Sequence, residues 1–262
     1  MFSEKMTAYE FVVILMLALA LCSNGAKRKP ATNYFSICDE KDPKLLNDCI
    51  KSTMMEIKPI IAKGIPELGV QPAEPMIIER IEMSDGQNNF RFKQILTDLK
   101  VYGLTNYEVI EFSADFKNLT FHTVLLQKQI NFDGNYEMDG QILVIPVKGH
   151  GQVIYNFTDI TVTFDSTMEI YNENGVDYIK IKKSKMDLNP KKGHSYFTNL
   201  FNGDKRLGDA TNKFLNNNWR DAFEAVRTLP EEAFAEVLTA YANNVYTKFP
   251  LKELFPSYEY LL

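Results

Sequence analysis

The fold follows from residues 204–249, which read DKRLGDATNKFLNNNWRDAFEAVRTLPEEAFAEVLTAYANNVYTKF. Apolar side chains recur there at helical spacing along one face, and the same kind of stripe resumes after Pro230. The stripe comprises Leu207, Phe214, Leu215, Ala222, Val226, Phe234, Val237, Leu238, Tyr241 and Val245. The pattern predicts one kinked helix, or two in tandem, with a length of about 60 Å. Because a compact domain of this size is narrower than that, we expect the rest of the chain to wrap around the helix.

Residues 76–187 have the sequence pattern of an antiparallel sheet. Short β-rich runs alternate there with turn signals typical of hairpins, namely Asp85-Gly86, Asp133-Gly134-Asn135, Asp139-Gly140 and Asn174-Gly175. Sheet and helix together predict an α+β fold, with an antiparallel sheet around a long C-terminal helix.

Two N-glycosylation sequons, at Asn118 and Asn156, indicate how the strands face. A glycan must stand in water, so both asparagines should point outward. The period of two along a strand then turns the neighbouring residues inward, among them Leu119, Phe121, Tyr155 and Phe157.

A further helix is expected near the N-terminus. Asp42-Pro43 provides an N-cap and a proline at the first helical position, and apolar residues recur from Leu45 to Ile61. Gly64 should end this helix, and Pro59 should kink it or end it early.

The first residues have the pattern of a secretory signal peptide. Residues 11–21 read FVVILMLALAL, which is too short for a spanning helix of about 20 residues. Cleavage after Cys22 or after Gly25 would suit the peptidase, and either cut removes Cys22. We expect a signal peptide at residues 1–25, a single domain at 26–262, an extracellular location and no stable membrane insertion.

The two remaining cysteines, Cys38 and Cys49, are expected to form a disulfide in an oxidising compartment. In the chain-entropy model a loop of this size contributes roughly 2.5 to 3 kcal/mol. A redox or metal pair is the alternative, but it would favour closer spacing or histidine partners, and the three histidines are far apart in sequence.

Composition and motifs exclude several classes of function. The chain has 262 residues, a net charge of −5 and a pI near 5.4, which argues against a nucleic-acid binder. A nucleophile elbow, a Walker loop and a zinc-binding His-Glu-x-x-His pair are all absent from the sequence. The sequence therefore predicts no enzyme, no metal and no cofactor, and a lipid-ester hydrolase is the least favoured alternative.

The chain is rich in large apolar side chains, with 18 Phe, 13 Tyr and 10 Met. They can all be core, yet a sheet curved around one helix encloses a long volume that such residues can line without filling. An apolar cavity with few polar groups suits a small hydrophobic ligand.

Seven motifs occur in order along the chain: CDEKDP (38–43), CIKS (49–52), GIPELGV (64–70), LKVYGL (99–104), FDGNY (132–136), LFNGD (200–204) and ELFP (253–256). In these motifs the chain resembles the insect takeout and haemolymph juvenile hormone binding protein family. The resemblance implies a strongly curved antiparallel sheet that wraps a long C-terminal helix and encloses an elongated apolar tunnel for a lipid-like ligand.

One departure from the family pattern affects the expected ligand. The moth hormone carriers have a second disulfide, whereas this chain has cysteines for only the first, which places it nearer the takeout branch. That branch is associated with feeding, circadian output, courtship or chemosensation. Juvenile hormone is therefore one candidate ligand among isoprenoids and fatty-acid-like molecules.

The sequence thus favours a secreted carrier of a hydrophobic ligand. Tunnel-lining candidates are Leu119, Phe121, Tyr155, Phe157, Phe214, Phe234, Val237 and Tyr241. The alternative is a secreted signalling or interaction protein that engages a receptor or a haemolymph partner through its surface. The basic residues Lys27–Lys29 and the sequons are compatible with that alternative.

Overall fold

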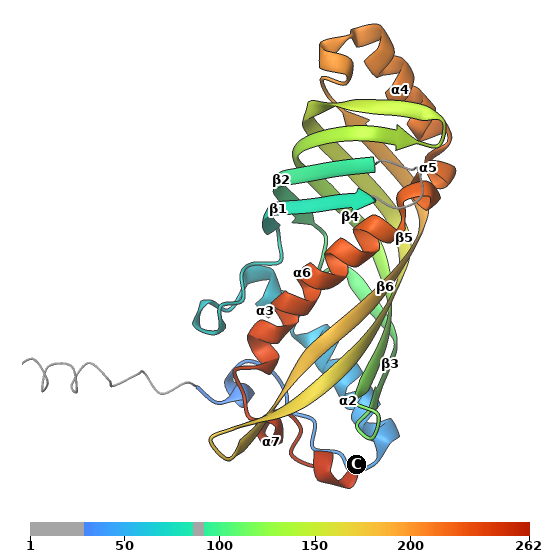
Figure 1. Ribbon diagram of the computed structural model, residues 1–262. Coiled ribbons are helices and arrows are strands. Elements are labelled where there is room, and N and C mark those ends of the chain that lie inside the picture. The colour runs from blue at the N-terminus through green and yellow to red at the C-terminus, as the bar shows by residue number, and fades with distance from the viewer. Residues whose placement is uncertain (1–28, 86–91) are drawn as a thin grey trace, which may run out of the picture.

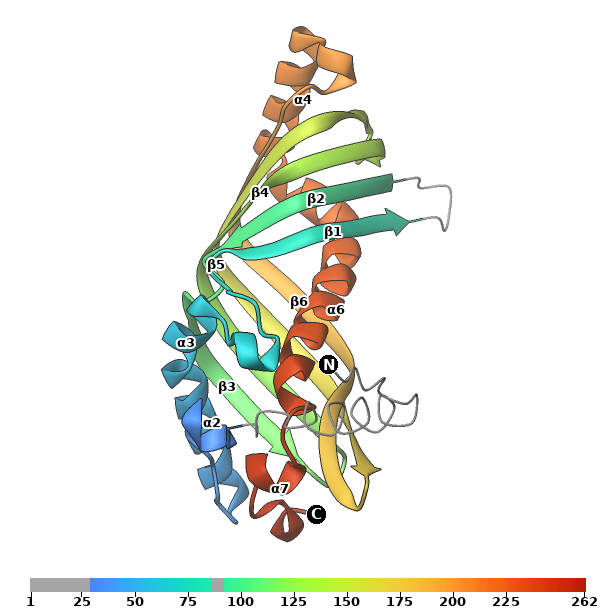
Figure 2. The same ribbon diagram turned by 90° about the vertical axis from the view of Figure 1, so that its left-hand side faces the viewer.

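The computed structural model describes residues 29–85 and 92–262 and shows an antiparallel sheet that curls around a C-terminal helix (Figures 1 and 2). The predicted signal peptide and Cys22 lie outside the described residues. The elements in chain order are η1 (Ala31–Asn33), α2 (Pro43–Glu56), α3 (Lys58–Lys63), η2 (Pro66–Leu68), β1 (Met76–Asp85), β2 (Phe92–Tyr102), β3 (Tyr107–Asp115), β4 (Thr120–Ile142), β5 (Ile145–Glu173), β6 (Val176–Phe197), η3 (Phe201–Gly203), α4 (Lys205–Asn217), α5 (Trp219–Val226), α6 (Thr228–Tyr246), α7 (Leu251–Leu254) and η4 (Tyr258–Tyr260).

The strands are ordered β1-β2-β4-β5-β6, and β3 pairs with the first part of β4, beyond the end of β2. All of these pairings are antiparallel. Helix α6 packs against both β6 and β1, the outer strands of the order. The helix therefore bridges the two sides of the curled sheet, which confirms the wrapped arrangement.

The strands are much longer than the expected short runs, with 23 residues in β4, 29 in β5 and 22 in β6. Asn174-Gly175 forms the β5–β6 turn as predicted, with both residues at positive φ. The prediction of turns at Asp133-Gly134-Asn135 and Asp139-Gly140 was wrong, because both segments lie inside β4. A Cβ at Gly134 would come within 3.0 Å of the backbone of Leu99, so glycine is needed there for a close approach and not for a turn.

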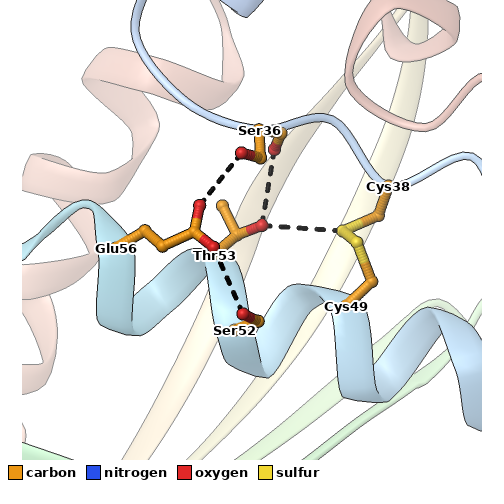
Figure 3. The surroundings of a disulfide bond; sticks show 6 residues. All are labelled: Ser36, Cys38, Cys49, Ser52, Thr53 and Glu56. Carbon is orange, nitrogen blue, oxygen red and sulfur yellow. Dashed lines mark hydrogen bonds between the residues drawn. A yellow bond between two sulfur atoms is a disulfide. The ribbon is translucent and has the colours of Figure 1, made fainter.

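The N-terminal helix begins as predicted. Asp42 accepts hydrogen bonds from the backbone amides of Lys44 and Leu45 at 2.9 and 3.0 Å, and α2 breaks before Pro59 into the short helix α3. The disulfide joins Cys38 to Cys49 and ties the N-terminal arm to α2 (Figure 3). Beside it, the Ser36 hydroxyl donates to the Glu56 carboxylate at 2.9 Å.

The C-terminal helix has three segments, and its breaks do not fall at Pro230. The chain bends at Asn218, whose side-chain amide donates to the Phe214 carbonyl at 2.9 Å, and again at Arg227. Pro230 instead lies in the first turn of α6, where its missing N–H costs no helical hydrogen bond.

Asparagine side chains attach the helices to β6. The Asn212 amide accepts from the Phe197 N–H at 3.0 Å and donates to the Phe197 carbonyl at 2.9 Å. Asn216 makes the same pair of bonds with Ser195, and Asn243 makes it with Ile181. These amides form hydrogen bonds with backbone N–H and C=O groups that would otherwise be free on the outer edge of β6.

Side chains of α2 and α3 bind the backbone of β3. Ala114 donates its N–H to Asn47 at 3.0 Å, and Lys51 donates to the Ile110 carbonyl at 2.9 Å. Lys58 donates to the carbonyl of Tyr107, and the Tyr107 hydroxyl donates back to the Met54 carbonyl at 2.8 Å.

Two core clusters lie along the sheet. The first cluster packs β1, β2 and adjoining parts of β4 to β6 against α4, α5 and α6. The second cluster lies at the other end, between the N-terminal segment, α7 and the C-terminus. In the second cluster Phe116 makes edge contacts with Phe121 and Phe255, with ring centroids 5.7 and 5.2 Å apart.

The contacts on β6 predict a large effect of the Asn212→Ala substitution. It leaves the buried N–H and C=O of Phe197 without their partners, and each unsatisfied group costs about 1 to 3 kcal/mol. We expect a loss of about 2 to 4 kcal/mol in the free energy of unfolding, measured by urea denaturation. Asn217→Ala, at an exposed position of the same helix, should stay within about 0.5 kcal/mol of the wild type. An equal effect of both changes would contradict this role of Asn212.

Candidate functional site

A cavity of about 390 Å³ lies between the curled sheet and the C-terminal helices. Residues of all six strands line it on the sheet side, and residues of α5 and α6 form most of the helix side. Helices α2, α3 and α4 contribute one residue each, namely Met54, Ile61 and Leu215. Aspartate, glutamate, lysine and arginine are absent from the described residues that form the lining. The walls are mainly aliphatic and aromatic, which is the composition of a site for an apolar molecule.

Aromatic rings connect the two layers across the cavity wall. Phe132 makes edge contacts with Tyr155 and Phe157, both at 6.4 Å between ring centroids. The Phe132 ring also lies 5.3 Å from Phe234 on α6, and Phe157 lies 5.7 Å from Phe223 on α5. Such ring pairs stabilise a fixed wall beyond the burial of their surface.

Gly193 on β6 allows Trp219 to pack closely against the strand. A Cβ at this position would lie 2.6 Å from a ring carbon of Trp219 and 2.9 Å from the ring of Phe157. Any larger residue would therefore displace one of the two rings. The Arg220 guanidinium also lies over the indole, 4.5 Å from the ring centroid.

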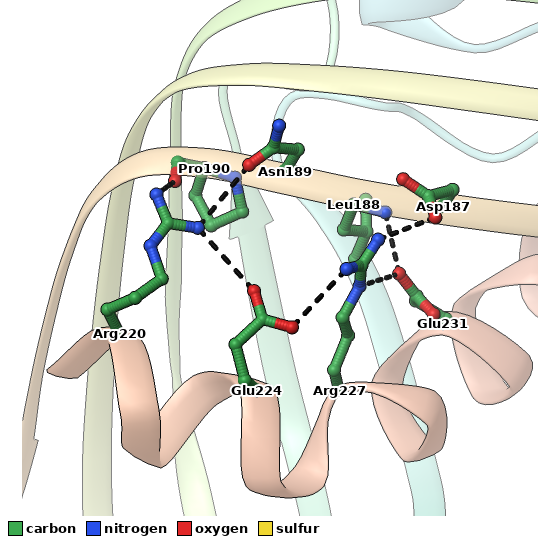
Figure 4. A network of polar contacts seen from close by, with 8 residues as sticks. All are labelled: Asp187, Leu188, Asn189, Pro190, Arg220, Glu224, Arg227 and Glu231. Carbon is green, nitrogen blue, oxygen red and sulfur yellow. Dashed lines mark hydrogen bonds and ion pairs between the residues drawn. The ribbon is translucent and has the colours of Figure 1, made fainter.

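An ionic network fixes the joint between α5 and α6 next to the cavity (Figure 4). Arg227 contacts Asp187 at 2.5 Å, Glu231 at 2.7 Å and Glu224 at 3.3 Å. The hydrogen bond to Glu231 raises the pKa of Arg227. Glu231 also accepts the backbone N–H of Leu188, a lining residue of β6, at 2.7 Å. The network thus joins both helices to the strand that forms the cavity wall.

Two amide side chains, Gln94 and Gln127, are buried in the lining, each 4% exposed. Gln94 donates to the Tyr155 hydroxyl, with 2.6 Å between nitrogen and oxygen. The side-chain nitrogen of Gln127 donates to the backbone carbonyls of Gly103 and Gln129 at 2.6 and 2.8 Å. Gln127 thus holds the β2–β3 loop, whereas Gln94 bonds only to another lining residue.

The structure brings five of the eight expected lining residues to the cavity. These are Tyr155, Phe157, Phe234, Val237 and Tyr241. It places Leu119 and Phe121 in the second core cluster, away from the lining, and Phe214 against the first cluster without reaching the cavity. For Phe121 the inward direction was right, but this end of β4 packs on the second cluster. Leu119 precedes β4 and lies in a turn at positive φ, so the alternation of a strand does not apply to it.

Sequence reasoning missed Gln94 and Trp219. The signal for Gln94 was present, because Phe92, Gln94 and Leu96 share one face of β2 and all three are buried. A polar residue in an inward position of a strand indicates a buried hydrogen bond. Trp219 had no such signal, since its place depends on the bend at Asn218 and on Gly193 in a distant strand.

The two sequon asparagines lie in different environments. Asn118 is exposed in the turn between β3 and β4, and its amide donates to the Asp115 carboxylate at 2.7 Å. Asn156 is half-buried in the middle of β5, paired with Asn131 on one side and His194 on the other. Its amide donates to the side chain of Asn131.

The described residues contain no cluster of three or more metal-ligating side chains. His122 lies 2.6 Å from Asp165, but neither residue lines the cavity. Within residues 29–85 and 92–262, no helix is both long enough and apolar enough to span a bilayer.

Comparison with known proteins gives consistent matches. Residues 14–256 match the family model of the haemolymph juvenile hormone binding protein (JHBP). The circadian clock-controlled protein daywake of Drosophila melanogaster is 28% identical over 200 residues, which cover 73% of this chain and 77% of that protein. Its counterpart in Drosophila yakuba is 27% identical over 201 residues, or 74% and 77% of the two chains. The crystal structure of Epiphyas postvittana Takeout 1 superposes with a TM-score of 0.71 at 24% identity, over 84% of this chain and 98% of that one.

The different settings of the sequons predict different glycosylation. We expect a glycan on Asn118, because its turn is exposed, and none on Asn156, because paired strands flank it on both sides. In protein secreted from insect cells, Asn118→Gln should abolish the mass shift on treatment with an N-glycosidase. Asn156→Gln should leave that shift unchanged, and a reduced shift in this second variant would contradict the prediction.

Proposed function

The chain belongs to the haemolymph juvenile hormone binding protein family, and on this basis we propose that it is a secreted carrier for a small hydrophobic ligand. The observation that supports this function most directly is the cavity of about 390 Å³ with a lining that lacks charged side chains among the described residues. An apolar molecule in this cavity would be covered by the sheet on one side and by the helices on the other. The proposal includes an elongated, tunnel-like course of the cavity.

The size of the hydrophobic effect is sufficient for such a function. Burial of about 400 Å² of apolar ligand surface, at roughly 25 cal/mol per Å², contributes about 10 kcal/mol before the costs of association. Dissociation constants between micromolar and nanomolar are therefore within reach.

The proposal extends to the location and physiology of the protein. We infer a signal peptide at residues 1–25, cleaved after Cys22 or Gly25, and one ligand-binding domain at 26–262 that acts outside the cell. The name of the daywake proteins, which are described as circadian clock-controlled, supports a link to circadian, feeding, courtship or chemosensory physiology. Juvenile hormone is one candidate ligand, and other isoprenoids and fatty-acid-like molecules are alternatives.

Native mass spectrometry of the secreted protein tests the carrier function. The expected result is a complex with a co-purified lipid, or with juvenile hormone or a long-chain isoprenoid added at micromolar concentration. If none of these molecules binds, the carrier function is refuted, and a protein that acts through its surface becomes the better explanation.

A substitution that fills the cavity should block binding without unfolding the protein. Ala222 lines the cavity from α5, so an Ala222→Phe change places a ring in the space for the ligand. We expect at least a tenfold loss of affinity, measured by titration calorimetry, with a melting temperature equal to or above that of the wild type. Ala240→Phe makes the same change at an exposed position of α6 and should bind normally. Full affinity in Ala222→Phe would place the ligand elsewhere.

A further inference from the structure

The hairpin between β4 and β5 has an apolar tip. Residues 142–147 read ILVIPV, and the turn itself consists of Leu143 and Val144. The side chain of Val144 is 76% exposed, the largest fraction among the exposed large apolar side chains of the described residues. A run of apolar residues at a protruding turn leaves hydrophobic surface in water, which a partner could cover with a gain in free energy.

The turn chemistry distinguishes this tip from the β5–β6 hairpin. Leu143 has a φ of 55°, in the left-handed region where hairpin turns favour glycine, asparagine or aspartate. The β5–β6 turn follows that preference, with Asn174 at a φ of 53° and Gly175 at 83°. In the β4–β5 turn a leucine takes such a position although its side chain disfavours the conformation. The apolar residues of this tip are therefore not explained by the needs of the turn.

The backbone of the tip presents few free polar groups. The side-chain amide of Gln141 donates to the carbonyl of Leu143 at 2.7 Å. Pro146 has no N–H to satisfy, and Ile142 pairs with Ile145 in the last step of the ladder. Unbonded backbone groups oppose entry into a lipid layer, because lipid offers them no hydrogen-bond partner. The tip thus lacks much of the polar surface that keeps an ordinary hairpin turn in water.

The base of the tip is part of the cavity wall. Ile142 is buried and lines the cavity, and Leu143 is half-buried and packs against the first core cluster. Val144 is not a lining residue and points away from this packing into solvent. A surface that covers Val144 would therefore lie two positions along the chain from the cavity wall.

The charges around the tip favour an electrically neutral partner. Lys148 and Asp139 face each other across the two strands and form an exposed ion pair at 2.8 Å, so their charges cancel. The chain as a whole has a net charge of −5, which repels anionic surfaces. A layer of zwitterionic phospholipid has both an apolar interior and no net charge.

We propose that the tip of the β4–β5 hairpin, residues 143–146, is a membrane-contact site that inserts reversibly into the surface of a zwitterionic phospholipid layer. This inference goes beyond the proposed carrier function, because the contact uses the outside of the protein and needs no bound ligand. Few apolar side chains enter the layer, so the attachment is weak and reversible. It brings the part of the cavity wall formed by Ile142 next to the lipid.

Flotation with vesicles of dioleoyl phosphatidylcholine tests the site. The fraction of wild-type protein that floats should rise with lipid concentration. Val144→Asp places a charge at the point of insertion and should lower the partition coefficient by about tenfold or more. Addition of phosphatidylglycerol to the vesicles should not increase binding, because the protein and this lipid are both negatively charged.

Val176→Asp is the matched control. Val176 is 40% exposed and follows the turn of the β5–β6 hairpin, at the opposite end of the sheet (Figures 1 and 2). The same change of valine to aspartate should leave vesicle binding there as in the wild type. Val144→Leu keeps the tip apolar and should bind at least as well as the wild type. Circular dichroism and melting temperature verify that each variant is folded.

Three results would overturn the membrane-contact site. In the first, the wild type does not float with the vesicles, or Val144→Asp floats equally well. In the second, binding requires phosphatidylglycerol and is insensitive to Val144→Asp. In the third, the wild type ignores the vesicles but forms a dimer that Val144→Asp dissociates, which would make the tip a contact between copies of the chain. None of them bears on the carrier function, which native mass spectrometry tests without vesicles.

Discussion

The backbone groups along the outer strands of the curled sheet must find hydrogen-bond partners, and the helices supply them. A sheet that wraps around a helix without closing into a barrel leaves N–H and C=O groups free on its last strands. On β6 three asparagines of α4 and α6 imitate a neighbouring strand, each with one donated and one accepted bond. On β3 the side chains of α2 and α3 make single bonds to the backbone: Lys51 and Lys58 donate to carbonyls, and Asn47 accepts an N–H. These contacts fix the distance between each helix and the sheet. The cavity lies between the sheet and the C-terminal helices.

Much of this fold could be predicted from local sequence patterns. The Asp42-Pro43 start of α2, the Asn174-Gly175 turn and the apolar stripe of the C-terminal helix each depend on neighbouring residues. The errors arose where one signal has two physical causes. Gly134 has the sequence context of a turn, but the glycine is needed because Leu99 of β2 lies against it. The bend at Asn218 depends on an amide that bonds to its own helix, which a periodicity analysis does not detect.

The cavity was only partly predictable for a related reason. Alternation along a strand gives the direction of a side chain, which was correct for Tyr155 and Phe157 as well as for Phe121. It does not give the position along a strand as long as β4, where one end faces the cavity and the other faces a solid core. Which part of β4 faces the cavity depends on pairing between segments distant in the sequence. One part of β4 pairs with β2 and the other part pairs with β3.

The long strands have a consequence for how the protein unfolds. Each of β4, β5 and β6 contributes buried side chains to both core clusters: Phe132 and Phe121 from β4, Val153 and Met168 from β5, and Phe197 and Ile181 from β6. Neither cluster can lose its packing without disturbing strands that the other one needs. We therefore expect the two clusters to unfold together, so that added packing at the cavity also stabilises the disulfide-bonded end.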